Sequence, residues 1–405
     1  MRQPVQYKLK NLSNMGAVDE LISASKSWHA NDTVVLDYQS VRTTWPNTTA
    51  SLAATLQYLR SHKQIHFVAD RIHPNQSRTW VQSPRSISGL ANGEYPTNTV
   101  WRYSTEDEAH RISDAFMNSL TDLVICEAGV IDTLNWCIYE VLDNVFQHSH
   151  AEEGFVMLQI HTKNRTCVLS VTDTGRGIHR AMAGAAQGSS VDPTRVRTAE
   201  NAISHALEQG ITSKGNDNQG NGLHGLRRAV EINGGTLTVR SGRGSWRYQD
   251  GRGVAELDLV RPLLNVESSH STTVDWRLDC AMPVSINDAL GRAEQESAIL
   301  SPLWTEDGYH RIDAAELETM VGFRQQGTEV RTRIQNYLAA GAGQVVLDLT
   351  GIPLVSSSFA DEVLGKLARE LGETEFRNTV YWEGASKVNR GIIERAIELR
   401  LNAGY

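Results

Sequence analysis

Cysteine is scarce in this sequence of 405 residues, and the four that occur form no recognisable metal or redox motif. No two of them stand at the Cys-x-x-Cys spacing that is typical of zinc and thiol–disulfide sites. Each has apolar neighbours, so we expect buried, reduced thiols and a cytoplasmic location. The four are Cys126, Cys137, Cys167 and Cys280.

Long apolar runs and an excess of basic charge are also missing. No stretch of about eighteen apolar residues exists, so we expect no membrane-spanning helix. The polar start, MRQPVQYKLKNLSNMG, lacks the apolar centre of a signal peptide. Lys and Arg number 39 against 47 Asp and Glu, a net charge of -8, which argues against nucleic-acid binding driven by overall charge.

The composition that remains is that of folded domains. Hydrophobic residues make up 40% and charged residues 21% of the chain, a balance that supports packed cores. At roughly 150 residues per domain, the length predicts two or three domains.

Both ends of the chain show the pattern of a small α/β domain. Near the start, an apolar run at 33–38 predicts a strand, 51–62 a helix and 64–69 a second strand. Near the end, the same order recurs as a strand at 344–349, a helix at 356–371 and a strand at 378–382.

The middle of the chain has a different pattern. A helical region at 105–150 precedes two apolar runs, 155–160 and 166–171, that we expect to pair as antiparallel strands. Glycine then concentrates between Gly210 and Gly253, where the backbone turns sharply or approaches a ligand. With a linker at 75–99 and a boundary near Pro283, we expect domains at 1–98, 99–283 and 284–405.

The first of three motifs in the middle domain lies at the end of its helical region. Glu140 and Asn144 are four residues apart and therefore project from one face of a helix, with His148 one turn further. A carboxylate beside an amide oxygen can orient water and hold Mg²⁺, and the histidine can reach a phosphate. On its own, the segment is better explained as the solvated stripe of an amphipathic helix.

The other two motifs are rich in glycine. Asp173-Thr-Gly175-Arg-Gly177-Ile178 follows an apolar strand, so its carboxylate can accept a hydrogen bond from an exocyclic amine while the glycines let the backbone approach a flat base. An ordinary Asp-Gly turn is the alternative. Gly220-Asn-Gly222-Leu223-His224-Gly225 precedes a helix at 226–232, an arrangement that favours phosphate, and Lys214 lies just upstream. A flexible loop is the alternative there.

Taken together and in this order, the three motifs resemble the GHKL ATPase superfamily of DNA gyrase, heat-shock chaperones, histidine kinases and MutL. The resemblance covers residues 100–283 and implies an α+β sandwich, within an α/β chain, that binds ATP and Mg²⁺. It implies that Glu140 is the general base, that Asn144 is the magnesium ligand and that Asp173 reads the adenine amino group. Residues 179–220 would form the ATP lid. The implied nucleotide-binding residues are Asn144, Asp143, His148, Asp173, Gly175, Gly177, Ile178, Lys214, Gly220, Gly222, Leu223, His224, Gly225 and Thr273.

The kinase branch is the nearest in detail, since Gln147-His148-Ser149 and the ITSKG segment are similar to its motifs. A histidine kinase also needs a phosphoacceptor histidine followed by an acidic residue. The only nearby candidate, His110, is followed by Arg111. We therefore do not expect autophosphorylation on histidine.

The segment 345–362 resembles a STAS-like domain of the kind often joined to GHKL domains. That resemblance implies a phosphorylatable serine at the start of its helix, best matched by Ser357 and next by Ser358. The alternative is that Ser356 to Ser358 cap the helix, with Asp361 completing a capping box from Ser358. The N-terminal domain is similar in pattern, but Thr43-Thr-Trp-Pro46 replaces the serine run.

These features favour an ATP-binding regulatory protein. ATP hydrolysis or phosphoryl transfer would drive lid closure and partner switching. The more specific form of this hypothesis is a serine kinase. A protein partner, or self-association through the STAS-like domains, is implied. One alternative is a MutL-like clamp on nucleic acid, and the feature that favours it is a cluster of basic residues, Arg240, Arg243, Arg247 and Arg252. Another is a nucleotide-sensing module without turnover. Glu140 argues against the sensor, because a protein that only senses nucleotide does not require a general base.

Overall fold

A computed structural model describes residues 3–402 apart from several short segments. The segments outside the described residues are 72–80, 82, 92–93, 214–220, 261–262, 292–299, 301–302, 306–307 and 315–323. Two of the expected nucleotide-binding residues, Lys214 and Gly220, therefore lie outside the described residues.

Contacts between residues divide the chain into two compact units. The first comprises residues 1–116 and 134–279, and the second comprises 117–133 and 280–405. The first unit thus joins the N-terminal α/β region to the central sheet, while the second joins the C-terminal region to the connection between helices α3 and α4.

The N-terminal region is a parallel three-stranded sheet in the order β1-β2-β3. Helix α2 begins at Pro46, whose fixed φ suits the first helical position, so the helix starts five residues earlier than expected. Its small and apolar residues are buried around most of its circumference rather than on one stripe. The elements are β1 (Val5–Lys8), α1 (Gly16–Ser25), β2 (Thr33–Asp37), α2 (Pro46–Lys63) and β3 (His66–Asp70).

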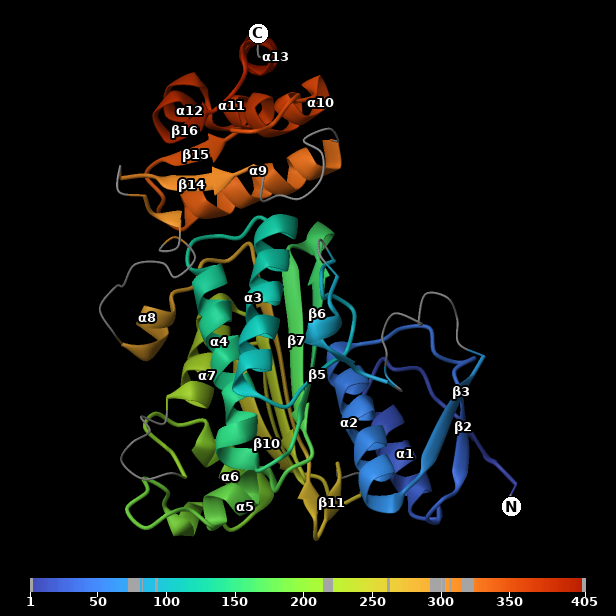
Figure 1. Ribbon diagram of the computed structural model, residues 1–405. Helices are drawn as coiled ribbons and strands as arrows, with labels where there is room; N and C mark the ends of the chain where they lie inside the picture. The colour runs from blue at the N-terminus through green and yellow to red at the C-terminus, as the bar shows by residue number, and fades with distance from the viewer. Residues whose placement is uncertain are drawn as a thin grey trace. The chain divides into compact units, whose positions relative to one another are not determined.

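The central sheet has eight strands in the order β10-β9-β8-β13-β7-β6-β5-β4 (Figure 1). Strands β6 and β7 pair antiparallel, as expected from the two apolar runs. The strands are β4 (Arg85–Ser86), β5 (Trp101–Tyr103), β6 (Gly154–His161), β7 (Thr166–Asp173), β8 (Thr236–Ser241), β9 (Gly244–Gln249), β10 (Arg252–Leu257) and β13 (Thr272–Asp279), with a separate hairpin of β11 (Asn265–Val266) and β12 (Ser269–His270). The helices are α3 (Glu106–Leu123), α4 (Val130–Asn144), α5 (Gly177–Ala183), α6 (Ala199–Ala206) and α7 (Gly222–Asn233).

The two faces of this sheet meet different neighbours. Neighbouring residues on a strand point to opposite faces, so Thr172 and Asp173 of β7 lie on opposite sides. The face of Thr172 packs against α2, and its Phe155 and Met157 share one hydrophobic core with Leu52 and other residues of the N-terminal region. Helix α7 contacts β8 and β13, and α6 contacts β9 and β10.

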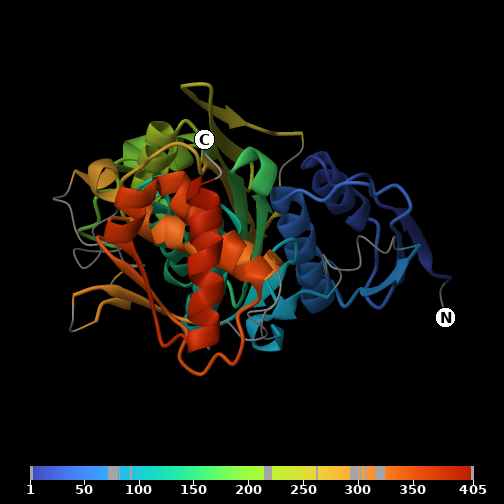
Figure 2. The ribbon, with the colours of Figure 1, turned by 90° about the horizontal axis from the view of Figure 1, so that it is seen from above.

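The second unit contains a parallel sheet in the order β14-β15-β16, with its own hydrophobic core. Figure 2 shows its orange and red helices, among which α13 packs against α10 and α11. The elements are α8 (Ile286–Leu290), β14 (His310–Asp313), α9 (Arg324–Ala339), β15 (Val345–Asp348), α10 (Ser357–Ala360), α11 (Lys366–Leu371), α12 (Glu373–Thr379), β16 (Val380–Glu383) and α13 (Lys387–Asn402). The sequence therefore placed the strand, helix and strand of 344–382 correctly.

All four cysteines are buried and free, as expected. Among the described residues, no helix has both the length and the apolar character needed to cross a membrane.

Candidate nucleotide site

The first motif lies at the end of helix α4. Apolar residues spaced three and four apart, including Leu134, Ile138 and Val141, are buried and fix the inner face of the helix. After Asn144 the backbone widens into a π-helical turn, Val145–Ser149, which ends where His150 adopts a left-handed conformation with φ 56°. Such turns occur frequently at functional sites.

Glu140 and Gly222 bring the first and third motifs together. A Cβ atom on Gly222 would lie 2.5 Å from Oε2 of Glu140, so only glycine fits at this position without moving the carboxylate. Gly222 is the first residue of α7. The Glu140 carboxylate therefore lies beside a helix N-terminus, where backbone N–H groups favour phosphate.

Asn144 carries an unsatisfied polar atom. Its Nδ2 is buried and has no hydrogen-bond partner. A buried amide left without a partner costs free energy of about 1–3 kcal/mol, and native proteins keep few of them. A ligand that bonds to this amide would remove that cost.

The second motif packs directly on the end of the first. The Asp173 carboxylate accepts a hydrogen bond from Gly175 N at 2.8 Å. The Ser149 hydroxyl, which donates to the Val145 carbonyl at 2.6 Å, lies near the same carboxylate. A Cβ on Gly175 would lie 2.2 Å from the carbonyl oxygen of Ser149. Arg176 donates from Nε to the His148 carbonyl at 2.7 Å and from its backbone N to the Ser149 carbonyl at 2.8 Å.

Burial controls the charge of Asp173. The side chain is 6% exposed, and burial raises the pKa of its carboxyl to about 7 against the opposing effects of the Gly175 N–H and the Ser149 side chain. Burial, followed by the negative charges of Asp173 and Asp143, raises the pKa of Tyr103 well above its usual value.

The residues after Asp173 contact the ends of strands β8 and β13. Gly177 has φ +74°, and Ile178 N donates to Ser241 Oγ at 2.9 Å. Ser241 Oγ lies 2.9 Å from Thr272 Oγ1, and Thr272 pairs with Asp173 in the sheet register. Thr272 therefore shares the face of Asp173.

The structure places Thr273, one of the expected nucleotide-binding residues, on the opposite face of the sheet. Its hydroxyl lies 2.7 Å from Ser51 Oγ of helix α2 and 3.1 Å from Thr172 Oγ1. Pairing of β13 with β7 places Thr272, not Thr273, on the face of Asp173.

The segment expected to form the lid, as far as the structure describes it, has a small core of its own. Met182, Val196 and Ala202 are buried together. It touches the other motifs twice: His148 Nδ1 lies 2.9 Å from Ser213 Oγ, and His224 Nδ1 lies 3.3 Å from the Leu207 carbonyl oxygen. Burial lowers the pKa of His224, which favours the neutral imidazole.

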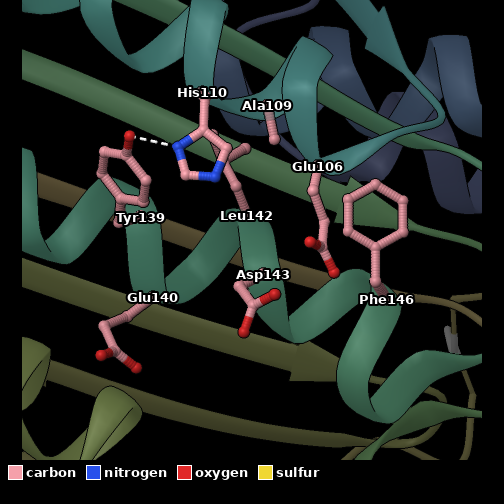
Figure 3. A pocket seen from close by; sticks show the side chains of 8 residues that line it. All are labelled: Glu106, Ala109, His110, Tyr139, Glu140, Leu142, Asp143 and Phe146. Carbon is pink, nitrogen blue, oxygen red and sulfur yellow. Dashed lines mark hydrogen bonds between the residues drawn. The ribbon is translucent and has the colours of Figure 1, made fainter.

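A cavity of about 190 Å³ lies on the α3 side of helix α4 (Figure 3). Glu140 and Asp143 line it, and Glu140 turns its carboxylate away from the pair formed by His110 and Tyr139, which are hydrogen bonded through Nδ1 and the phenol oxygen. The other lining residues are Glu106, Ala109, Leu142 and Phe146. His110 thus has a partner on α4.

The described residues fit a nucleotide. A buried carboxylate, an unsatisfied buried amide and three close glycine contacts meet at the ends of α4, β7 and α7. No group of three or more His, Cys, Asp and Glu residues in the described ranges is arranged to hold a metal ion. Mg²⁺ in nucleotide sites takes most of its ligands from phosphate and water, so Asn144 alone would supply the protein ligand.

At the start of helix α10 the structure corrects the expected cap. Ser356, not Ser358, is the N-cap: its Oγ accepts from Phe359 N at 3.1 Å and lies 3.0 Å from Ser358 Oγ. Asp361 instead forms an ion pair with Arg400, at 2.6 Å to Nε. Ser357 is exposed.

Ser241 was not predicted from the sequence, although its hydroxyl accepts from Ile178 N and lies 2.9 Å from Thr272 Oγ1. Serine is too common on strands for this position to stand out. Ser149 and Thr272 lie within segments that carried the resemblance, but neither was assigned a role.

Comparisons with known proteins match two stretches of the chain to known families. Residues 129–259 match the family described as histidine kinase-, DNA gyrase B- and HSP90-like ATPases, and residues 326–389 match a STAS-like domain of unknown function. A crystal structure of full-length ShkA in complex with AMPPNP is 13% identical, covers 86% of this chain and 69% of its own, and superposes with a TM-score of 0.23. No curated protein matches. The chain therefore contains a GHKL ATPase domain at residues 129–259 and a STAS-like domain at residues 326–389.

Proposed function

We propose that this chain is an ATP-dependent regulatory protein whose central domain, at 99–283, binds Mg-ATP between the ends of α4, β7 and α7. The contact between Gly222 and the Glu140 carboxylate carries the proposal, because it joins two motifs that lie about eighty residues apart in sequence. Asp173 would accept a hydrogen bond from the adenine amine, and Gly175 and Gly177 would let the base approach the backbone.

Each polar group has a defined task in this proposal. Asn144 would hold Mg²⁺, which neutralises phosphate charge when bound. Glu140 would take the proton of an attacking water or hydroxyl, since positioning and charge neutralisation dominate phosphoryl transfer. His148, fixed by Ser213, would tie the end of α4 to the lid.

Lid closure would change how the flanking regions meet a protein partner. The N-terminal region supports such a link, because Thr172 contacts Ser51 of α2 at 3.3 Å while its neighbour Asp173 lies in the site. We propose three domains, at 1–98, 99–283 and 284–405, with STAS-like α/β character at both ends. The four buried thiols support a reducing, cytoplasmic setting.

Binding and turnover test this proposal directly. Calorimetry with Mg-ATP should show binding that Asp173→Asn weakens, and release of phosphate should be lost in Glu140→Gln while binding remains. Thr273→Val, on the other face of the sheet, is the control and should change neither. Absence of ATP binding, or equal binding by Asp173→Asn, would exclude the proposed site.

A serine kinase is the second candidate, and the position of Ser357 favours it. Because Ser356 provides the cap, Ser357 is left exposed at the first helical position, where a phosphate gains from the helix N-terminus. Incubation with Mg-ATP followed by mass spectrometry should find phosphate on Ser357, and Glu140→Gln should abolish it. Intact ATP turnover with unmodified serines would reject the kinase form.

The nucleic-acid clamp has less support. Of its four arginines, Arg240 forms an ion pair with Asp19 of helix α1, at 3.3 Å and with both side chains largely buried. An arginine held in this way is not available to phosphate.

A further inference from the structure

Strand β10 is one edge of the eight-stranded sheet. It pairs with β9, and in the described ranges no other strand pairs with it. All six of its residues, Arg252–Leu257, are exposed. Its outer row of backbone N–H and C=O groups can therefore pair with another strand.

Large apolar side chains are exposed on this edge and just beyond it. Val254 is 51% and Leu257 41% exposed, and the chain continues through Leu259 at 62% and Val260 at 86%. Proteins normally protect edges with charged side chains, proline, bulges or short length. Strand β10 has no proline and no bulge, since its register with β9 is regular over six residues, and its two charged residues, Arg252 and Glu256, have opposite signs.

The turn before β10 fixes which backbone groups face outward. Asp250 and Gly251 have φ values of 52° and 77°, which makes a two-residue hairpin closed by the pair of Gln249 and Arg252. Because hydrogen-bonded pairs alternate, Arg252, Val254 and Glu256 bond toward β9. The N–H and C=O groups of Gly253, Ala255 and Leu257 consequently point to the open edge.

The two faces of the β9–β10 hairpin differ. Gly253 lies against the ring of Trp246, which also receives the Arg227 guanidinium of helix α7. Helix α6 contacts β9 and β10 on the same side, so this face of the hairpin is the one toward α6 and α7. Arg252, Val254 and Glu256 lie on the other face, the one that packs against α2 further along the sheet. At β10 that face is exposed.

We propose that a second copy of this chain adds its own β10 to this edge, antiparallel and around a two-fold axis through Val254. The charge pattern of the strand is the reason to choose a second copy, because it is complementary to itself. With Val254 opposite Val254 of the second copy, Arg252 stands opposite Glu256 of the second copy, and the same pair recurs across the axis.

The hydrogen-bond register agrees with this arrangement. Gly253 and Ala255 carry the outward groups and would pair with Ala255 and Gly253 of the second copy. Arg252, Val254 and Glu256 then occupy non-hydrogen-bonded positions, where opposite Cα atoms approach to about 4.5 Å and side chains lie closest. The interface does not involve the STAS-like domain or the nucleotide site, so the inference goes beyond the proposed function.

A cysteine cross-link tests the register. In Val254→Cys the two thiols would meet across the axis at a separation that a disulfide can bridge. The native cysteines are all buried, so mild oxidation should convert this variant, but not the native chain, to a covalent dimer. Arg247→Cys is the matched control: it is the register partner of Val254 on β9, one strand from the edge, and its thiols would lie roughly 14 Å apart.

Charge exchange tests the pairing without a cross-link. Sedimentation of the full chain over a concentration series should show a dimer, and Arg252→Glu or Glu256→Arg alone should weaken it by about tenfold, equivalent to about 1.4 kcal/mol. The double exchange Arg252→Glu with Glu256→Arg should restore the native affinity. A monomer at every concentration, a dimer insensitive to both single exchanges, or cross-linking of Arg247→Cys as readily as Val254→Cys would overturn the proposal. Dimerisation only in the presence of another macromolecule would overturn it as well.

Discussion

The hydroxyl oxygens of Ser51 and Thr273 lie 2.7 Å apart, although 222 positions separate the two residues in sequence. Thr172 completes the group, at 3.3 Å from Ser51 and 3.1 Å from Thr273. These three hydroxyls join helix α2 to the middle of the central sheet. Asp173 follows Thr172 on β7, and Thr272 precedes Thr273 on β13. Asp173 and Thr272 point to the face with the proposed nucleotide site, whereas Thr172 and Thr273 point to the face that packs against α2. A shift of one residue along either strand therefore changes the face.

The first prediction uses this alternation. Thr272→Val removes the hydroxyl that bonds to Ser241 beneath Ile178, and should weaken ATP binding measured by calorimetry. Thr273→Val removes a buried hydroxyl bond on the other face, and should lower the free energy of unfolding by about 1 kcal/mol while leaving ATP affinity unchanged. The reverse result would place the nucleotide on the α2 face of the sheet.

The second prediction concerns Gly222. In Gly222→Ala the new methyl group would meet the Glu140 carboxylate at 2.5 Å, and the flexible end of that side chain would move aside. We therefore expect release of phosphate to fall at least tenfold, with little change in the melting temperature. Gly391→Ala in helix α13, where a Cβ meets nothing within 4 Å, is the control and should leave turnover unchanged.

Much of this fold was predictable from local patterns. The apolar run 166–171 and its neighbour gave the β6–β7 pair, and the Glu140–Asn144 spacing on one helix face held because helix geometry is local. The order of the three motifs then led to the site that we propose at the ends of α4, β7 and α7.

What the sequence did not predict depends on contacts between distant segments. Whether Thr272 or Thr273 faces the site is set by pairing of β13 with β7. The predicted helix began at Ser51 because the segment Thr43 to Asn47 was interpreted as a turn, yet α2 begins at Pro46, and Thr48 and Thr49 are fully buried against distant segments. The cap at Ser356 rather than Ser358 likewise follows from where the backbone enters the helix.

The third prediction concerns pH and Asp275, which lies on the α2 face of β13. Its Oδ1 is buried without a partner, Asn47 reaches Oδ2 at 3.5 Å, and burial raises the pKa of its carboxyl to about 7. Because the folded-state pKa is raised above the unfolded value, the protonated form stabilises the fold below about pH 4, and this stability is lost as pH rises through 7.

Asp275→Asn should therefore raise the free energy of unfolding at pH 8, by about 1–3 kcal/mol, and by much less at pH 5. Denaturant titrations at the two values measure this. Asp250→Asn, at the exposed β9–β10 turn, is the control and should change neither value. A larger gain at pH 5 than at pH 8 would contradict the expected sign.

The fourth prediction concerns Asn336, which caps the end of helix α3 from helix α9. Its side chain is 1% exposed and donates to the carbonyls of Thr121 and Val124, at 2.7 and 2.9 Å, while accepting from Cys126 N at 2.7 Å. Asn336→Ala removes all three of these buried hydrogen bonds.

We expect Asn336→Ala to lower the free energy of unfolding by about 2–4 kcal/mol, measured by denaturant titration. Gln335, the neighbour of Asn336 in sequence, makes an exposed hydrogen bond to Glu370. Gln335→Ala should lower the free energy of unfolding by less than about 0.5 kcal/mol. Equal losses in the two variants would show that the cap contributes little.

The last prediction separates capping from phosphorylation at helix α10. Ser356→Ala removes the hydroxyl that accepts from Phe359 N, and should lower the free energy of unfolding by about 1 kcal/mol. Ser357→Ala removes an exposed hydroxyl and should leave stability unchanged, because alanine is at least as good in a helix. After incubation with Mg-ATP, Ser356→Ala should still acquire phosphate and Ser357→Ala should not. If Ser357→Ala still acquires phosphate, the acceptor is another residue, and Ser358 is the next one to substitute.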